Sequence, residues 1–146
     1  MYLNAEVYLS EYQEKEKALM DLIKENSIHG LSNHLPRHIT YEIGYWRKAN
    51  AIHKWFVDNV QEGEDDCESY YVPIEKLTEL KEICEKILAD NTLAAQLLPS
   101  ASGFFFGSTQ YDDWYFDDLK KTVLIINKVL ENPDHKSWDI KYHSSW

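Results

Sequence analysis

The stretch Gly44-Tyr-Trp-Arg-Lys-Ala-Asn-Ala-Ile-His-Lys-Trp-Phe56 decides most of what this sequence predicts about its fold. Apolar residues recur through it at the spacing of one helix face, in the series Tyr45, Ala49, Ile52, Phe56 and Val60. We therefore expect a central helix from about Thr40, which can cap a helix N-terminus, to about Gln61. Gly44 would lie in its second turn, where a glycine allows the close approach of a packed neighbour or of a ligand.

A second stripe of the same expected helix carries polar and cationic groups beside an aromatic ring. It contains Trp46, Asn50 and His53, and it is flanked by Arg47 and Lys54. The ring can stack on a planar group, the cations can neutralise an anion, and the amide and imidazole can read polar edges. The alternative is a helix rim on which the tryptophan packs halfway and the charges are solvated.

Both ends of the chain alternate apolar and polar residues, which is the pattern of a half-buried strand. The N-terminal alternation covers residues 2–9, and the C-terminal one places Trp138, Ile140 and Tyr142 on one face. Two strands at opposite ends of a chain pair most simply with each other, antiparallel, on one side of a helical body.

Three further helices and one short helical segment complete the expected fold. One begins after Ser10 and buries Leu19, Leu22 and Ile23, and another follows Pro73 and buries a stripe from Leu77 to Leu88. A short helical segment covers residues 92–98, and the last long helix runs from residues 110–112 to Asn132. We expect a single α+β domain over residues 1–146, with about four main helices around one core and a small antiparallel sheet that pairs the terminal strands.

The composition restricts the classes of function. The net charge is −10, from 25 acidic and 15 basic residues, which disfavours direct nucleic-acid binding because affinity there depends on phosphate neutralisation. The charge is uneven: residues 37–54 carry a net +3, and residues 62–68 carry −5. A local basic patch on an acidic body suits a small anionic ligand better than a polymer.

The sequence predicts neither export nor membrane insertion. The opening residues lack a basic segment followed by an apolar one, and the chain has no apolar run of 18 residues. Cys67 and Cys84 lie 17 positions apart, without the spacing of a zinc or redox site, so we expect two reduced thiols in a cytoplasmic protein.

A phenylalanine-rich segment, Gly103-Phe-Phe-Phe-Gly, precedes the last long helix. It can be a tight turn with three buried rings. Alternatively, Phe105 stacks on the same ligand, and Ser108, Thr109 and Tyr111 supply hydroxyls near a helix N-terminus, where backbone N–H groups attract anions.

The sequence contains no established catalytic or metal-binding motif. The spacing of His29, His34 and His38 matches no ligand signature, so we expect no metal and no cofactor. Cys67 and His53 could form a nucleophile and base only if the fold positioned them, and the acidic loop around Cys67 would raise its thiol pKa. We therefore expect no enzymatic activity.

Three blocks of the sequence resemble one family. They are Tyr45-Trp-Arg-Lys-Ala-Asn-Ala-Ile-His-Lys-Trp-Phe56, Gly103-Phe-Phe-Phe-Gly-Ser-Thr-Gln-Tyr-Asp112 and Tyr142-His-Ser-Ser-Trp146. Together they are similar to a family of small proteins without assigned biochemical function from bacteriophages and prophage-bearing bacterial genomes. The resemblance implies an accessory protein that acts in the host cytoplasm, including against antiviral defence.

These observations favour a non-enzymatic protein that sequesters a small nucleotide-like anion, such as a defence signalling molecule. The rival hypothesis is a protein inhibitor whose acidic runs, Glu62–Glu68 and Asp112–Asp118, dock on a basic host protein. A hydrolase for the same ligands is a third alternative. The sequence leaves open whether the site lies within one subunit or between two, so a homo-oligomer is among the alternatives.

Overall fold

The computed structural model covers residues 1–146 and describes residues 1–9, 13–26, 36–102 and 109–145. Its elements are β1 (Tyr2–Tyr8), α1 (Glu14–Glu25), β2 (His38–Tyr45), α2 (Asn50–Asn59), β3 (Tyr70–Tyr71), α3 (Ile74–Ala89), the 3₁₀ turn η1 (Asn91–Leu93), α4 (Ala94–Leu97), α5 (Asp113–Glu131), the 3₁₀ turn η2 (His135–Ser137) and β4 (Asp139–His143). Helices together with an antiparallel sheet confirm the predicted α+β class.

The sheet has four strands in the order β2-β1-β4-β3, and all neighbours are antiparallel. The predicted pairing of the terminal strands is confirmed, because β1 lies beside β4 with Leu3 opposite Tyr142 and Ala5 opposite Ile140. All four of these side chains are buried. The period-2 alternation therefore places both apolar rows on the same, core-facing side of the sheet.

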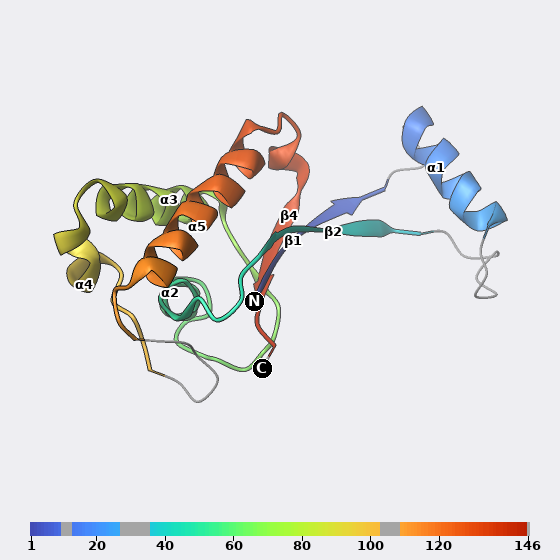
Figure 1. The fold of residues 1–146 in the computed structure, drawn as a ribbon. Helices are drawn as coiled ribbons and strands as arrows, with labels where there is room; N and C mark the ends of the chain where they lie inside the picture. Colours follow the sequence, from blue (N-terminus) through green and yellow to red (C-terminus); the bar gives the residue numbers. More distant parts are fainter. Residues whose placement is uncertain (10–12, 27–35, 103–108, 146) are drawn as a thin grey trace.

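The core lies between this sheet and the helices α2, α3 and α5 (Figure 1). Its largest fully buried side chains include Trp46, Phe56 and Tyr142. The Phe56 and Tyr142 rings stack with centroids 3.9 Å apart, and Trp46 packs at 5.9 Å from Phe56. The helix over 74–88 and the last long helix are confirmed, and Leu80 and Leu119 are fully buried on their inner faces.

The predicted central helix is wrong over its first half. Residues His38–Tyr45 form strand β2, and helix α2 begins only at Asn50. Ile39, Thr40 and Ile43 are β-branched and favour a strand, whereas the helical spacing that starts at Tyr45 is a coincidence. Tyr45 is 38% exposed and belongs to the strand; the helical part of the series, Ala49 to Phe56, is buried.

Gly44 shows the predicted close approach of a packed neighbour, although in a strand. A Cβ atom at this position would lie 2.7 Å from Cγ2 of Ile125 and 3.4 Å from Cβ of Leu3. Helix α5 therefore crosses directly over the backbone of β2, and any larger side chain would push the helix away.

Helix α1 differs from the prediction in its surroundings. It lies at the end of the ribbon formed by β1 and β2, apart from the other helices (Figure 1), and only Met20 is buried along its length. The predicted core residues Leu19, Leu22 and Ile23 are 36%, 57% and 39% exposed, so their predicted burial is wrong. The predicted cap Ser10 lies outside the described residues. Across the described part of the chain, no helix is long and apolar enough to cross a membrane.

Candidate functional site

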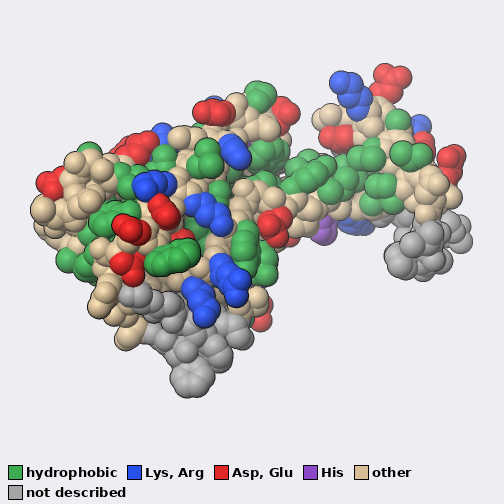
Figure 2. Space-filling model, viewed as in Figure 1, with side chains coloured by type: hydrophobic (Ala, Val, Ile, Leu, Met, Phe, Trp, Pro, Cys, Tyr) green, Lys and Arg blue, Asp and Glu red, His purple; other side chains and the backbone are tan. Residues whose placement is uncertain are grey.

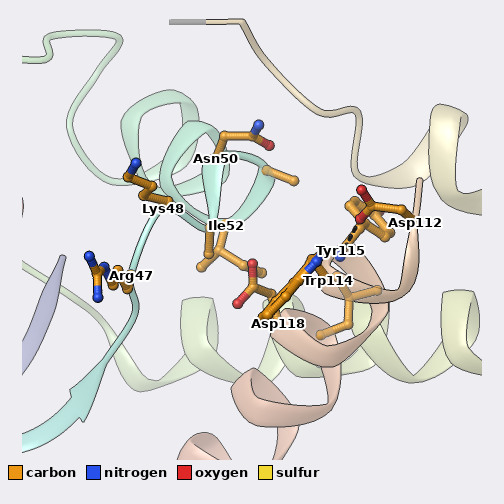
Figure 3. Close-up of a pocket in the computed structure, with 11 residues that line it drawn as sticks. Arg47, Lys48, Asn50, Ile52, Asp112, Trp114, Tyr115 and Asp118 are labelled. Atoms are coloured by element: carbon orange, nitrogen blue, oxygen red, sulfur yellow. Dashed lines mark hydrogen bonds between the residues drawn. The ribbon is translucent and has the colours of Figure 1, made fainter. Parts of the chain in front are cut away.

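A pocket of about 610 Å³ lies between the start of α2 and the first turns of α5. Residues 47–52 form one wall, and Asp112, Trp114, Tyr115, Asp118 and Leu119 form the other. Figure 3 shows Arg47 and Lys48 on the segment that enters α2, across from Trp114 and Asp118 on α5. The volume falls within the range of small-molecule sites, about 300–1,000 Å³.

The α2 wall is basic and begins with a sharp turn. Lys48 has φ +60°, a left-handed conformation in the bend between β2 and α2. Arg47 and Lys48 are exposed on this turn. Among the described residues, no side chain caps the N-terminus of α2. The two cations and the positive end of the helix dipole therefore favour a negative group at this wall.

The α5 wall presents an aromatic ring and carboxylates. Trp114 is 80% exposed, the largest exposure among the large apolar residues that the structure describes. Asp112 caps α5 by accepting a hydrogen bond from the backbone N–H of Tyr115 at 3.2 Å. The Tyr115 hydroxyl donates to the carbonyl of Leu98 at 2.8 Å, which fixes the base of this wall.

Asp118 is the carboxylate with the most perturbed environment in the pocket. Burial raises its pKa to about 6, and the negative charges of Asp117 and Asp112 add to this effect. Lys121 acts in the opposite direction. A carboxylate that is partly desolvated in a pocket gains from any ligand that donates hydrogen bonds to it.

The nine residues predicted to bind a ligand do not form one cluster. Arg47 and Asn50 line the pocket. Tyr111 lies next to this region, with its ring 5.0 Å from the Tyr115 ring, and the backbone carbonyl of exposed Thr109 accepts a hydrogen bond from Ser100. Phe105 and Ser108 lie outside the described residues.

Trp46 is a correction to the predicted site. Its side chain is fully buried, and its indole N–H donates to the Thr122 hydroxyl at 2.9 Å. Its backbone N–H also donates to the carbonyl of Met1 at 2.9 Å. A ring enclosed in this way cannot stack on a ligand, so Trp46 is a core residue.

Lys54 and His53 also lie away from the pocket. Lys54 forms an ion pair with Asp58 one turn along α2 and lines a separate cavity of about 220 Å³. His53 is buried, with Nδ1 2.7 Å from the Tyr142 hydroxyl and Nε2 3.0 Å from a carboxylate oxygen of Asp65. Both ring nitrogens therefore have partners, which leaves neither for the Cys67 thiol.

His53, Tyr142 and Asp65 form a hydrogen-bonded group, the His53 cluster, that links three parts of the fold. It joins α2 to strand β4 through Tyr142 and to the acidic loop of residues 62–68 through Asp65. Burial, with the nearby charge of Asp65, raises the pKa of the Tyr142 hydroxyl, so this group stays protonated. The cluster fixes the position of the loop on the body.

Of the eleven residues that line the pocket, the sequence interpretation named only Arg47 and Asn50 as ligand-binding residues, and it left out the charged and aromatic groups Lys48, Trp114 and Asp118. Trp114 falls outside the apolar stripe of its helix, which was a signal that its ring is not core. In the sequence, Asp118 belongs to the acidic run Asp112–Asp118, which the rival hypothesis docks on a basic host protein. Within the described residues, no group of three or more His, Cys, Asp or Glu residues could hold a metal ion.

Comparison with protein-family models, curated proteins and solved structures finds no match for this chain. The inference of function therefore depends on the geometry and charge of the pocket.

Proposed function

We propose that this protein binds a small nucleotide-like anion in the pocket between α2 and α5 and sequesters it without chemical change. The observation that carries the proposal is the pair Arg47 and Lys48 opposite an exposed tryptophan, Trp114, across a pocket of about 610 Å³. A phosphate needs cations and N–H donors, and a base needs a planar apolar ring.

Each wall of the pocket binds a different part of the proposed ligand. Its phosphate lies against Arg47, Lys48 and the N-terminus of α2, where the chain concentrates positive charge. Its base stacks on Trp114, and its amino or hydroxyl donors reach Asp118. This division explains why a pocket for an anion contains a carboxylate, since Asp118 would repel a ligand that consisted only of phosphate.

Calorimetric titration with a panel of linear and cyclic nucleotides tests this proposal. We expect at least one to bind, and Trp114→Ala to weaken that binding about tenfold or more, since base stacking contributes about 1–3 kcal/mol. Tyr71→Ala is the matched control, because Tyr71 is an aromatic that is 58% exposed on β3, outside the pocket. Lack of binding across the panel would contradict the proposal.

Chromatography of the bound nucleotide after prolonged incubation separates sequestration from hydrolysis. We expect the ligand to be recovered unchanged, because the pocket holds no paired nucleophile and base among the described residues. Recovery of a cleaved product would favour the hydrolase instead.

The rival hypothesis, an acidic inhibitor of a host protein, has one observation in its favour. The acidic residues of the loop 62–68 are exposed. The second acidic run is less available, because Asp112 caps α5, Asp117 pairs with Lys120 at 2.8 Å, and Asp118 lies in the pocket. If the protein is an acidic inhibitor, charge reversal at Glu62 and Glu64 should abolish capture of a basic partner. If it binds a nucleotide in the pocket, the same changes should leave nucleotide binding unchanged.

A further inference from the structure

The ribbon of β1 and β2, together with α1, forms an arm that projects from the body (Figure 1). Strand β4 pairs with β1 only from Tyr2 to Glu6, so beyond this point the ribbon consists of two strands. A two-stranded ribbon in water is at best marginally stable without a packed surface. The arm therefore needs more contacts than the described body supplies.

Helix α1 exposes an apolar stripe on this arm. Leu19, Leu22 and Ile23 follow the spacing of one helix face, and each is at least 36% exposed. None of the residues of α1 belongs to the hydrophobic core cluster. In Figure 2, hydrophobic side chains also run along the strands of the arm, between α1 and the body.

Strand β2 is the edge of the sheet on the same arm. Its outer side pairs with no other strand in the described part of the chain. Monomeric proteins protect such edges with lysine, proline, short length or a covering element. β2 is eight residues long, it has neither lysine nor proline, and its single acidic residue is Glu42.

The charge distribution indicates which partner fits this surface. α1 carries four acidic residues and three lysines, a net charge of −1, in a chain whose net charge is −10. Two copies of the chain repel each other over most of their surfaces, and they can approach only where charge is balanced and apolar groups are exposed. A basic partner would instead be drawn to the acidic loop 62–68.

We propose that the arm is a homodimer interface, in which β2 pairs antiparallel with β2 of a second copy. A two-fold axis makes this pairing self-complementary, so one surface satisfies both open edges and joins the two sheets. The same axis brings the α1 stripe of each copy onto the arm of the other. This inference does not depend on the ligand proposed for the pocket.

Light scattering coupled to size-exclusion chromatography tests the interface on the full chain over a wide range of protein concentration. We expect twice the chain mass of 17.2 kDa for the wild type and a single chain mass for Leu22→Glu. Leu124→Glu is the matched control: Leu124 is 55% exposed, against 57% for Leu22, and it lies on α5. This variant should remain dimeric.

Hydrogen exchange of the β2 amides provides a second measurement that does not depend on elution behaviour. The amides of residues 38–42 should gain protection with concentration in the wild type and lose it in Leu22→Glu. A wild type that is monomeric at every concentration would overturn the proposal and leave the arm to a partner of another sequence. A dimer that Leu22→Glu does not disrupt would also overturn it.

Discussion

The body and the arm both carry large apolar and aromatic side chains, but many of these are buried in the core of the body, whereas several on the arm are exposed. In the body, Phe56 and Tyr142 stack face to face, and Trp46 is fully buried against Phe56 and Thr122. On the arm, Leu22 and Tyr41 are 57% and 52% exposed. The difference teaches that apolar periodicity identifies a face that must be covered, but does not identify the element that covers it.

The largest expected difference between the two regions is in stability. Trp46→Ala should lower the free energy of unfolding by about 3–5 kcal/mol, because it opens a cavity in the core and removes the hydrogen bond to the Thr122 hydroxyl. Leu22→Ala should cost no more than about 0.5 kcal/mol in dilute protein, where any dimer is dissociated. Urea denaturation measures both. Equal losses would mean that the arm belongs to the cooperative core.

The His53 cluster should show an intermediate effect. Tyr142→Phe removes the hydroxyl that lies 2.7 Å from the buried Nδ1 of His53, and we expect a loss of about 1–3 kcal/mol. Tyr71→Phe, on the adjacent strand β3, removes an exposed hydroxyl and should change the free energy of unfolding by less than about 0.5 kcal/mol. If the two variants unfold at the same urea concentration, the cluster does not hold the loop to the body.

A smaller effect than these core losses concerns Asp118 in the pocket and depends on pH. Its pKa is raised to about 6 in the folded state, above the ordinary value of 3.8, so the folded protein binds the proton more tightly and loses stability as pH rises from about 4 to 6. Asp118→Asn removes this loss. After allowance for solvent screening, we expect the variant to be more stable than the wild type by about 1 kcal/mol at pH 7.

Below pH 4 this difference between Asp118→Asn and the wild type should vanish, because both side chains are then uncharged. Urea denaturation at several pH values measures it. A gain of the same size at low and neutral pH would show that shape rather than charge is responsible.

The terminal strands and the two long helices α3 and α5 could be predicted because their apolar residues follow the spacing of one face, and that face is buried in the fold. The alternation at Ile140 and Tyr142 matches a half-buried strand, and Leu80 and Leu119 lie on the buried faces of their helices. The boundary between β2 and α2 could not be found in the same way. Tyr45 continues the helical spacing of Ala49 and Ile52 by chance. The apolar pattern therefore predicted one helix on both sides of the bend at Lys48, where the structure has a strand and then a helix.

The site was predictable in its charge but not in its aromatic group. Arg47 was recognisable because basic residues are few and concentrated there. The sequence pattern favoured Trp46 as the stacking ring. Its burial is fixed by tertiary contacts such as the hydrogen bond from its indole N–H to Thr122, which the pattern does not show. The exposure of α1 was likewise not visible in its sequence, because its apolar stripe would look the same if it faced a core.

The central claim is that Arg47 and Trp114 bind an anionic nucleotide, and that the buried Trp46 does not. The most direct test is calorimetry of Arg47→Ala and Arg37→Ala with the nucleotide that binds best. Both variants lose one positive charge, but Arg37 lies beside β2 on the arm and does not line the pocket. We predict that Arg47→Ala weakens binding at least about tenfold, or about 1.4 kcal/mol, and that Arg37→Ala leaves it unchanged. Equal affinities for the two variants would contradict the account.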